Sequence, residues 1–293
     1  MLRRRADLEL TRREADRERA SGPQAGVWVT GQAESLPAAT GMHWQQKDSK
    51  GVITMKQPNR LKQALREQRI ARGYNLNFPA PHVIELLGPL EFDFVWFDGE
   101  HGPFTVEHLE HLCRTAESVG VTPVARVPDI QTSTILQFLD CGVQGIVGPH
   151  IATREAAEQL VRACYFGPLG DRSFGGNRGC DYDYQLGDKV AYYRRCNDNM
   201  VVSALLEDGG VLENLDEILE VEGIDYFDVG PNDFAQGIGF PGEPQRAEVV
   251  EAIESVHRRV RDAGGKTGPD VLRMVPVKQL LWDGARQFLE APA

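Results

Sequence analysis

Residues 96–105 read WFDGEHGPFT, and this turn carries more ionisable groups than a turn requires. Gly and Pro already supply the turn geometry. Asp98, Glu100 and His101 are additional, and they follow the largely apolar run FDFV. An imidazole titrates near neutral pH, so His101 is the natural residue to move a proton, and Asp98 or another carboxylate can fix its tautomer. The turn therefore predicts acid–base chemistry.

Three other charged side chains end apolar segments in the same way. Arg126 ends TPVAR, Glu207 ends VVSALLE, and Asp233 follows IDYFDVGPN. Two carboxylates with open coordination positions suit Mg²⁺ or Mn²⁺, which keep waters and accept substrate oxygens. The planar donor fork of Arg126 suits a carboxylate or a keto oxygen. These residue types predict a site that binds a small 2-oxo acid and stabilises its enolate with a metal.

Further positions extend the expected site. The backbone N–H groups of Asn232 and Asp233 can bind a carboxylate, Asn75 lies on the first expected strand, and His150 ends GIVGPH. Taken singly, each charged residue also fits a structural role as a helix cap, an ion-pair partner or a loop residue. Their coincidence at the ends of strands favours the functional interpretation, because core packing gives no reason for it.

The segments that must position these residues alternate between strand and helix from residue 57 onward. Eight segments read as strands, the last two being KTG and RQFLE, and the strands are apolar on both faces, as buried parallel strands should be. The dinucleotide fingerprint and the P-loop of open sheets are absent. We therefore predict an α/β fold, a (β/α)₈ TIM barrel over residues 55–293 that lacks the last helix. In such a barrel the chemistry lies at the carboxyl ends of the strands.

Composition excludes several classes of protein. The chain has 293 residues and a net charge of −11, so nucleic acid is not an expected partner. Its five cysteines show no C-x-x-C spacing, which argues against zinc, and their odd number favours a reducing, cytoplasmic location. No apolar run reaches about 18 residues, so no membrane span is expected.

Residues 1–54 differ from the rest of the chain. They are rich in Arg and Glu and then in small residues and helix breakers, without a sustained period. We interpret them as a disordered or non-native N-terminal extension. The functional protein would then start at Met55.

Several longer stretches carry a family resemblance. FDFVWFDGEHGPFTVEHL, VARVP, GPLGDRSFGG, LLEDGGVLENLDEIL and GIDYFDVGPNDFAQGIG resemble the signatures of the HpcH/HpaI aldolase and citrate lyase family, the class II pyruvate-dependent aldolases that include 2,4-dihydroxyhept-2-ene-1,7-dioate aldolase. The resemblance runs from about residue 57 to 268. It is specific for the family and less so for the substrate.

The resemblance implies an activity and a set of roles. The enzyme would be a carbon–carbon lyase that reversibly cleaves a 4-hydroxy-2-oxo acid to pyruvate and an aldehyde through a metal-stabilised enolate. Glu207 and Asp233 would bind Mg²⁺, Mn²⁺ or Co²⁺, and Arg126 would stabilise the enolate oxygen. His101 would transfer protons, and Asp140 matches a family aspartate that partners this histidine. Family members form homo-oligomers, trimers that pair into hexamers, with a final helix exchanged between subunits.

The sequence departs from the family at three places. Leu205 stands where many members have Gln, and Asn75 stands where Trp is common. By the resemblance, both lie where substrate would contact the wall, so they would bear on the choice of aldehyde. The expected eighth strand ends close to Ala293, which is why the last helix is expected to be missing.

Two other functions remain open at this point. A lyase acting on a CoA ester, as in citrate or malyl-CoA lyases, would use the same pair of carboxylates. A truncated, non-catalytic barrel would explain the short C-terminus.

Overall fold

The computed structural model describes residues 46–47, 53–54, 57–184 and 186–291. The chain divides into two compact units, Met1–His43 and Trp44–Ala293. The first unit lies outside the described residues, so most of the expected extension 1–54 is untested. Two short strands, β1 (Gln46–Lys47) and β2 (Ile53–Thr54), pair antiparallel.

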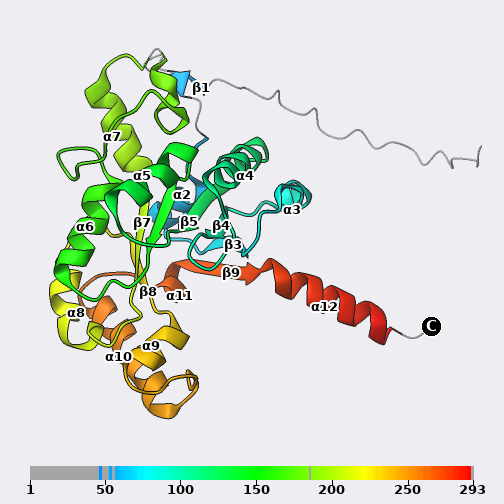
Figure 1. Ribbon diagram of the computed structural model, residues 1–293, viewed down its shortest axis with the longest axis vertical. Coiled ribbons are helices and arrows are strands. Elements are labelled where there is room, and N and C mark those ends of the chain that lie inside the picture. The colour runs from blue at the N-terminus through cyan, green and yellow to red at the C-terminus, as the bar shows by residue number, and fades with distance from the viewer. Residues whose placement is uncertain (1–45, 48–52, 55–56, 185, 292–293) are drawn as a thin grey trace, which may run out of the picture. The chain divides into compact units, whose positions relative to one another are not determined.

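A parallel sheet of seven strands organises the described part of the second unit (Figure 1). The strand order is β8-β7-β6-β5-β4-β3-β9, so neighbours in sequence are mostly neighbours in space. The strands are β3 (Ala71–Leu76), β4 (Phe94–Asp98), β5 (Thr122–Arg126), β6 (Gly145–Gly148), β7 (Val201–Leu205), β8 (Tyr226–Asp228) and β9 (Leu272–Pro276).

Helices connect these strands, as the alternating pattern predicts. Thr105 and Thr153 begin two of them by accepting the backbone N–H of His108 and Ala156, which satisfies donors that the first helical turn leaves open. The helices are α2 (Arg60–Arg66), α3 (Pro81–Leu87), α4 (Val106–Ser118), α5 (Thr132–Cys141), α6 (Arg154–Cys164), α7 (Lys189–Asn199), α8 (Val211–Leu219), α9 (Pro231–Gly237), α10 (Ala247–Asp262), α11 (Gly268–Val271) and α12 (Val277–Glu290), with 3₁₀ turns η1 (Gly88–Leu90) and η2 (Arg178–Asp183).

Two apolar clusters hold the sheet, one on each face. The larger packs the outer face against the surrounding helices. The smaller lies on the inner face, where Leu61 and Leu65 of α2 meet Phe94, Val124 and other residues that alternate along the strands. This inner cluster collects residues from both ends of the sheet, Tyr226 of β8 and the partly buried Leu272 of β9 among them, so the sheet is curled around it.

The C-terminal region corrects part of the predicted topology. RQFLE is not a strand: it forms the last turns of α12, and the strand that pairs with β3 is β9. The apolar residues Val277, Leu280, Leu281 and Phe288 recur at helical spacing, which explains why this segment is a helix. The last strand is therefore β9 and not RQFLE, and the prediction that no helix follows the last strand is wrong, because α12 follows β9.

The expected strand at KTG is also reduced. Only Thr267 makes an isolated parallel bridge, to Phe227 of β8. Within the described residues β8 and β9 share no ladder, so the architecture is a curled parallel α/β sheet of seven strands. None of the described helices is both long and apolar enough to span a bilayer.

Candidate active site

The carboxyl ends of β4 and β5 bring Asp98 and Arg126 together. The two residues are paired in register, and Asp98 is 3% exposed. Asp98 Oδ1 accepts from Arg126 Nε at 3.0 Å and Nη2 at 2.8 Å, and Oδ2 accepts from Asn77 Nδ2 at 2.9 Å. A carboxylate with this many charge-assisted partners is firmly placed. Asp98 therefore fixes the orientation of the Arg126 guanidinium.

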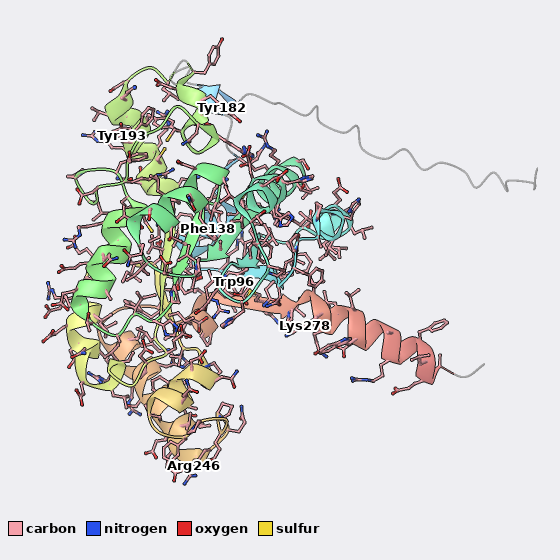
Figure 2. The ribbon with its side chains drawn as sticks, viewed as in Figure 1. Trp96, Phe138, Tyr182, Tyr193, Arg246 and Lys278 are labelled. Carbon is pink, nitrogen blue, oxygen red and sulfur yellow. The ribbon has the colours of Figure 1, made fainter. Side chains whose placement is uncertain are left out.

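Glu100 holds the other side of the same guanidinium. Its Oε2 lies 2.9 Å from Arg126 Nη1, and Oε1 lies 3.3 Å from His150 Nε2. The Arg126 guanidinium also lies over the ring of Trp96, 5.4 Å from its centroid; Figure 2 labels Trp96 on β4. Because a guanidinium has five N–H donors, the three nitrogens used here leave one N–H on each Nη to bind a substrate oxygen.

His101 lies at the tip of the turn, where its side chain is 62% exposed. Asp98 Oδ1 accepts the backbone N–H of His101 at 3.2 Å, so Asp98 orders the turn and not the imidazole ring. The carboxylate beside the ring is Glu100, with Oε2 3.8 Å from His101 Nε2. The imidazole therefore stands exposed at the rim, beside the Glu100 carboxylate.

His150 and Glu207 form the centre of the site. His150 adopts a left-handed backbone with φ of 55°, which turns its N–H onto Glu207 Oε1 at 3.1 Å. Its ring Nδ1 lies 3.2 Å from Asp208 Oδ1 and 3.7 Å from Glu207 Oε1. Burial alone would lower the pKa of this imidazole, but the surrounding carboxylates outweigh burial and raise the pKa above its usual value.

Glu207 is 1% exposed, and its two oxygens have different surroundings. Oε1 accepts the His150 N–H, while Oε2 has no hydrogen-bond partner among the described residues. A Cβ on Gly230 would lie 2.4 Å from Oε2, so only glycine leaves room there. Burial raises the pKa of the carboxyl to about 7, although the His150 N–H and nearby cations lower it.

Asp233 is the second carboxylate of the expected pair, and its role stays a prediction. It lies in the first turn of α9, shortly after β8, and β8 is the neighbour in the sheet of β7, which leads to Glu207. The Oε2 of Glu207, which has no hydrogen-bond partner among the described residues, and the Asp233 carboxylate are hard oxygen donors of the kind that Mg²⁺ and Mn²⁺ prefer. Among the described residues no group of three or more His, Cys, Asp or Glu is placed to hold a metal. A bound ion would therefore take its other ligands from substrate and water.

The expected wall residues lie on the same inner face. Leu205 ends β7 and is 7% exposed, and Asn75 lies on β3 with its Oδ1 buried and unpartnered. Asn232, in the first turn of α9, is exposed. Their roles in substrate binding stay predictions.

Asp140 lies apart from these residues. It is the penultimate residue of α5, beside Gly179 of η2. Because α5 returns from the carboxyl end of β5 to the amino end of β6, its last turn is at the other end of the strands. Within one chain the fold does not bring Asp140 to His101, and its role stays a prediction.

Glu100, His150 and Asp208 contribute more contacts than the sequence interpretation gave them. The signal for His150 was its place at the end of an apolar segment. The decisive feature, a backbone N–H turned by a positive φ, is invisible in a single sequence. Asp208 follows Glu207 directly and could have been included on position alone.

Comparison with known proteins shows the family of this chain. The profile of the HpcH/HpaI aldolase/citrate lyase family matches residues 76–288. A 2-keto-3-deoxy-L-rhamnonate aldolase of Escherichia coli is 32% identical over 72% of this chain and 78% of its own length, and one of Salmonella gallinarum is 34% identical over the same shares. The chain belongs to the HpcH/HpaI aldolase/citrate lyase family, whose aldolases are carbon–carbon lyases.

Solved structures share the fold. The HpcH/HpaI aldolase from Desulfitobacterium hafniense superimposes with a TM-score of 0.70 at 23% identity, over 80% of this chain and 98% of that one. At this identity the likeness shows the fold alone. It agrees with the curled parallel sheet described above.

Proposed function

We propose that this protein is a divalent-metal-dependent aldolase that reversibly cleaves a 4-hydroxy-2-oxo acid to pyruvate and an aldehyde. The observation that carries the proposal is the buried Glu207 carboxylate, whose Oε2 packs against Gly230 and has no hydrogen-bond partner among the described residues. A buried carboxylate oxygen without a donor is costly unless a cation or ligand completes it.

Glu207 and Asp233 would hold the ion, with Mg²⁺, Mn²⁺ and Co²⁺ as the candidates. When bound, the ion supplies Lewis acidity that stabilises negative charge on the oxygens of the 2-oxo acid. His150 orients Glu207 through its backbone N–H, which leaves Oε2 as the oxygen available to bind.

Arg126 binds the oxygen on which negative charge grows. In the cleavage direction the 4-hydroxyl loses its proton, the C3–C4 bond breaks, the aldehyde leaves, and the electron pair stays on pyruvate as its enolate. Asp98 and Glu100 hold the guanidinium in place before this charge develops, which is the condition for electrostatic stabilisation.

His101 moves the protons of both half-reactions. It takes the proton of the 4-hydroxyl on cleavage and returns one to C3 of the enolate. Its exposed imidazole and the neighbouring Glu100 carboxylate support this role.

The same proposal includes closure of the sheet into a barrel and assembly with further copies of the chain. The bridge between Phe227 and Thr267 lies where an eighth strand of a (β/α)₈ barrel would run. Helix α12 exposes Leu281 and Phe288, at 59% and 81%, which suits burial against a second copy in a trimer or hexamer. The five free cysteines suit a cytoplasmic location.

The direct test is cleavage of a panel of 4-hydroxy-2-oxo acids by the full chain, with pyruvate detected in the presence and absence of Mn²⁺. Metal-dependent pyruvate formation that Glu207→Gln abolishes would support the proposal. A folded protein that releases no pyruvate from any member of the panel would refute it. Binding of acetyl-CoA would favour the CoA-ester lyase instead.

A further inference from the structure

A cavity lies at the other end of the strands from the candidate active site. Val143 and Gln144, directly before β6, and Asn199 and Met200, directly before β7, contribute to its wall. These residues mark the amino ends of the strands, whereas Asp98, Arg126 and Glu207 are at the carboxyl ends. The cavity has a volume of about 300 Å³, which is the size of a pocket for a small molecule.

Arg172 is the unusual residue of this wall. It is 6% exposed, in the loop between α6 and η2. Within the described part of the chain its side chain makes one hydrogen bond, from Nη2 to the Gly179 carbonyl at 3.4 Å, and its Nε is buried without an acceptor. The guanidinium lies over the Phe166 ring, 4.7 Å from the centroid.

No carboxylate among the described residues forms an ion pair with Arg172. Buried arginines are normally paired, because removing a charge from water costs several kcal/mol or more. A stacked aromatic ring offsets only part of that cost. Within the part of the chain that the structure describes, the guanidinium is therefore a buried cation without a counter-ion.

The rest of the wall balances two arginines against two aspartates and adds apolar surface, so Arg172 leaves the wall with one net positive charge. Three arginines, Arg66, Arg172 and Arg195, line the cavity against two aspartates, Asp181 and Asp198. Asp181 already accepts the Tyr192 hydroxyl at 3.0 Å. The wall also includes apolar atoms of Val143, Met200 and Tyr192. The region lies around α7 and η2, where Tyr193 and Tyr182 are labelled in Figure 2.

We propose that this cavity binds a small organic oxyanion, a carboxylate or a phosphate monoester on an apolar or aromatic body, with Arg172 as its counter-ion. The planar fork of a guanidinium matches both oxyanions. Arg66, at the end of α2, adds a second positive charge from the exposed side of the wall. The site is independent of the aldolase reaction and requires no metal.

The test uses the full chain and three probes: inorganic phosphate, phenyl phosphate and benzoate, with chloride at matched ionic strength as the reference. Binding is measured by calorimetry and by the shift of the melting temperature. Wild-type protein should bind phenyl phosphate or benzoate more tightly than phosphate. Arg172→Gln should weaken that binding at least about tenfold, because a charge-assisted hydrogen bond is lost.

Three variants complete the experiment. Arg66→Gln should weaken binding severalfold, and it decides the question if Arg172→Gln fails to fold. Arg246→Gln, the same charge change on a distant surface, and Arg126→Gln, in the candidate active site, should both bind the probes as the wild type does. The proposal is overturned if no probe binds, if both cavity variants bind normally, or if Arg126→Gln alone abolishes binding.

Discussion

Arg126 donates to a single oxygen of Asp98 with two of its nitrogens, Nε at 3.0 Å and Nη2 at 2.8 Å. The two residues face each other in the register of β4 and β5, so the sheet itself sets the pair. Glu100 binds the remaining nitrogen of the guanidinium. The guanidinium is therefore held on two sides before any substrate binds. One N–H on each Nη remains to bind a substrate oxygen.

Replacing Arg126 by Lys should lower kcat of pyruvate formation by about 10²–10³-fold, the range for loss of one donor to a developing oxyanion. A lysine ammonium is a point charge and cannot keep both carboxylates while it reaches the substrate. Steady-state kinetics at saturating Mn²⁺ would measure this. Arg246→Lys, on the surface, should change nothing. An Arg126→Lys enzyme with wild-type kcat would show that the guanidinium only supports the fold.

Glu207→Gln should abolish measurable Mn²⁺ binding. The amide keeps an oxygen that can accept the His150 N–H, so the fold is expected to survive, but the charge that attracts the ion is gone. Calorimetric titration with Mn²⁺ measures this directly, without reference to activity. Glu158→Gln, a change at a side chain on α6 that is 40% exposed, is the matched control. Retained Mn²⁺ affinity in Glu207→Gln would place the metal elsewhere.

The same carboxyl predicts how metal binding depends on pH. Burial raises the pKa of Glu207 to about 7, so protons compete with the ion below that value. Mn²⁺ affinity should therefore fall about tenfold for each pH unit below 7 and level off above it. Titrations across this range measure the slope. A flat profile down to about pH 5 would mean that Glu207 is ionised in the free protein.

Much of the site was predictable because its charged residues stand at the ends of apolar strands. The strands that end in Asp98, Arg126 and Leu205 are buried on both faces, so a charged group at or just after the last position stands out. The same logic found Glu207 and Asp233. It could not find the hydrogen bond from His150 to Glu207, since that contact depends on a backbone angle and not on residue type.

The C-terminal region was harder for a physical reason. Thr267 makes a bridge and no strand, because the chain enters α11 directly after it. The strand β9 is only partly buried and reads as an ordinary connection. Phe288 and Leu289 are apolar enough for a buried strand, yet they are exposed on α12. In the sequence of a single chain, the hydrophobicity of these two residues suggests a buried strand, whereas the structure forms an exposed helix there.

Asp228→Asn should stabilise the protein near neutral pH. Asp228 ends β8 with its carboxyl against Gly268, and burial raises its pKa to about 6 from an ordinary value near 3.9. Because the pKa of this carboxyl is higher in the folded than in the unfolded protein, its protonation stabilises the fold at pH values below the ordinary pKa. This stabilisation is lost as the pH rises through 6.

Asn can still accept the Val229 N–H but carries no charge. The gain should reach up to about 3 kcal/mol above pH 7 and vanish near pH 4. Urea unfolding of both proteins across this range measures the difference. A gain that does not depend on pH would point to packing, and a loss would mean that the charge has a partner.

The exposed face of α12 should control assembly. Of its fourteen residues only Val277 is buried, and Figure 1 shows the helix continuing beyond β9. Leu281 and Phe288 would each contribute about 1.5–3 kcal/mol if buried against another copy. The double variant Leu281→Glu with Phe288→Glu should therefore shift the protein toward monomer, measured by sedimentation velocity. Gln279→Glu with Gln287→Glu adds the same charge to polar positions of the helix and should leave the assembly intact. Equal sedimentation of all three proteins would show that α12 does not join the subunits.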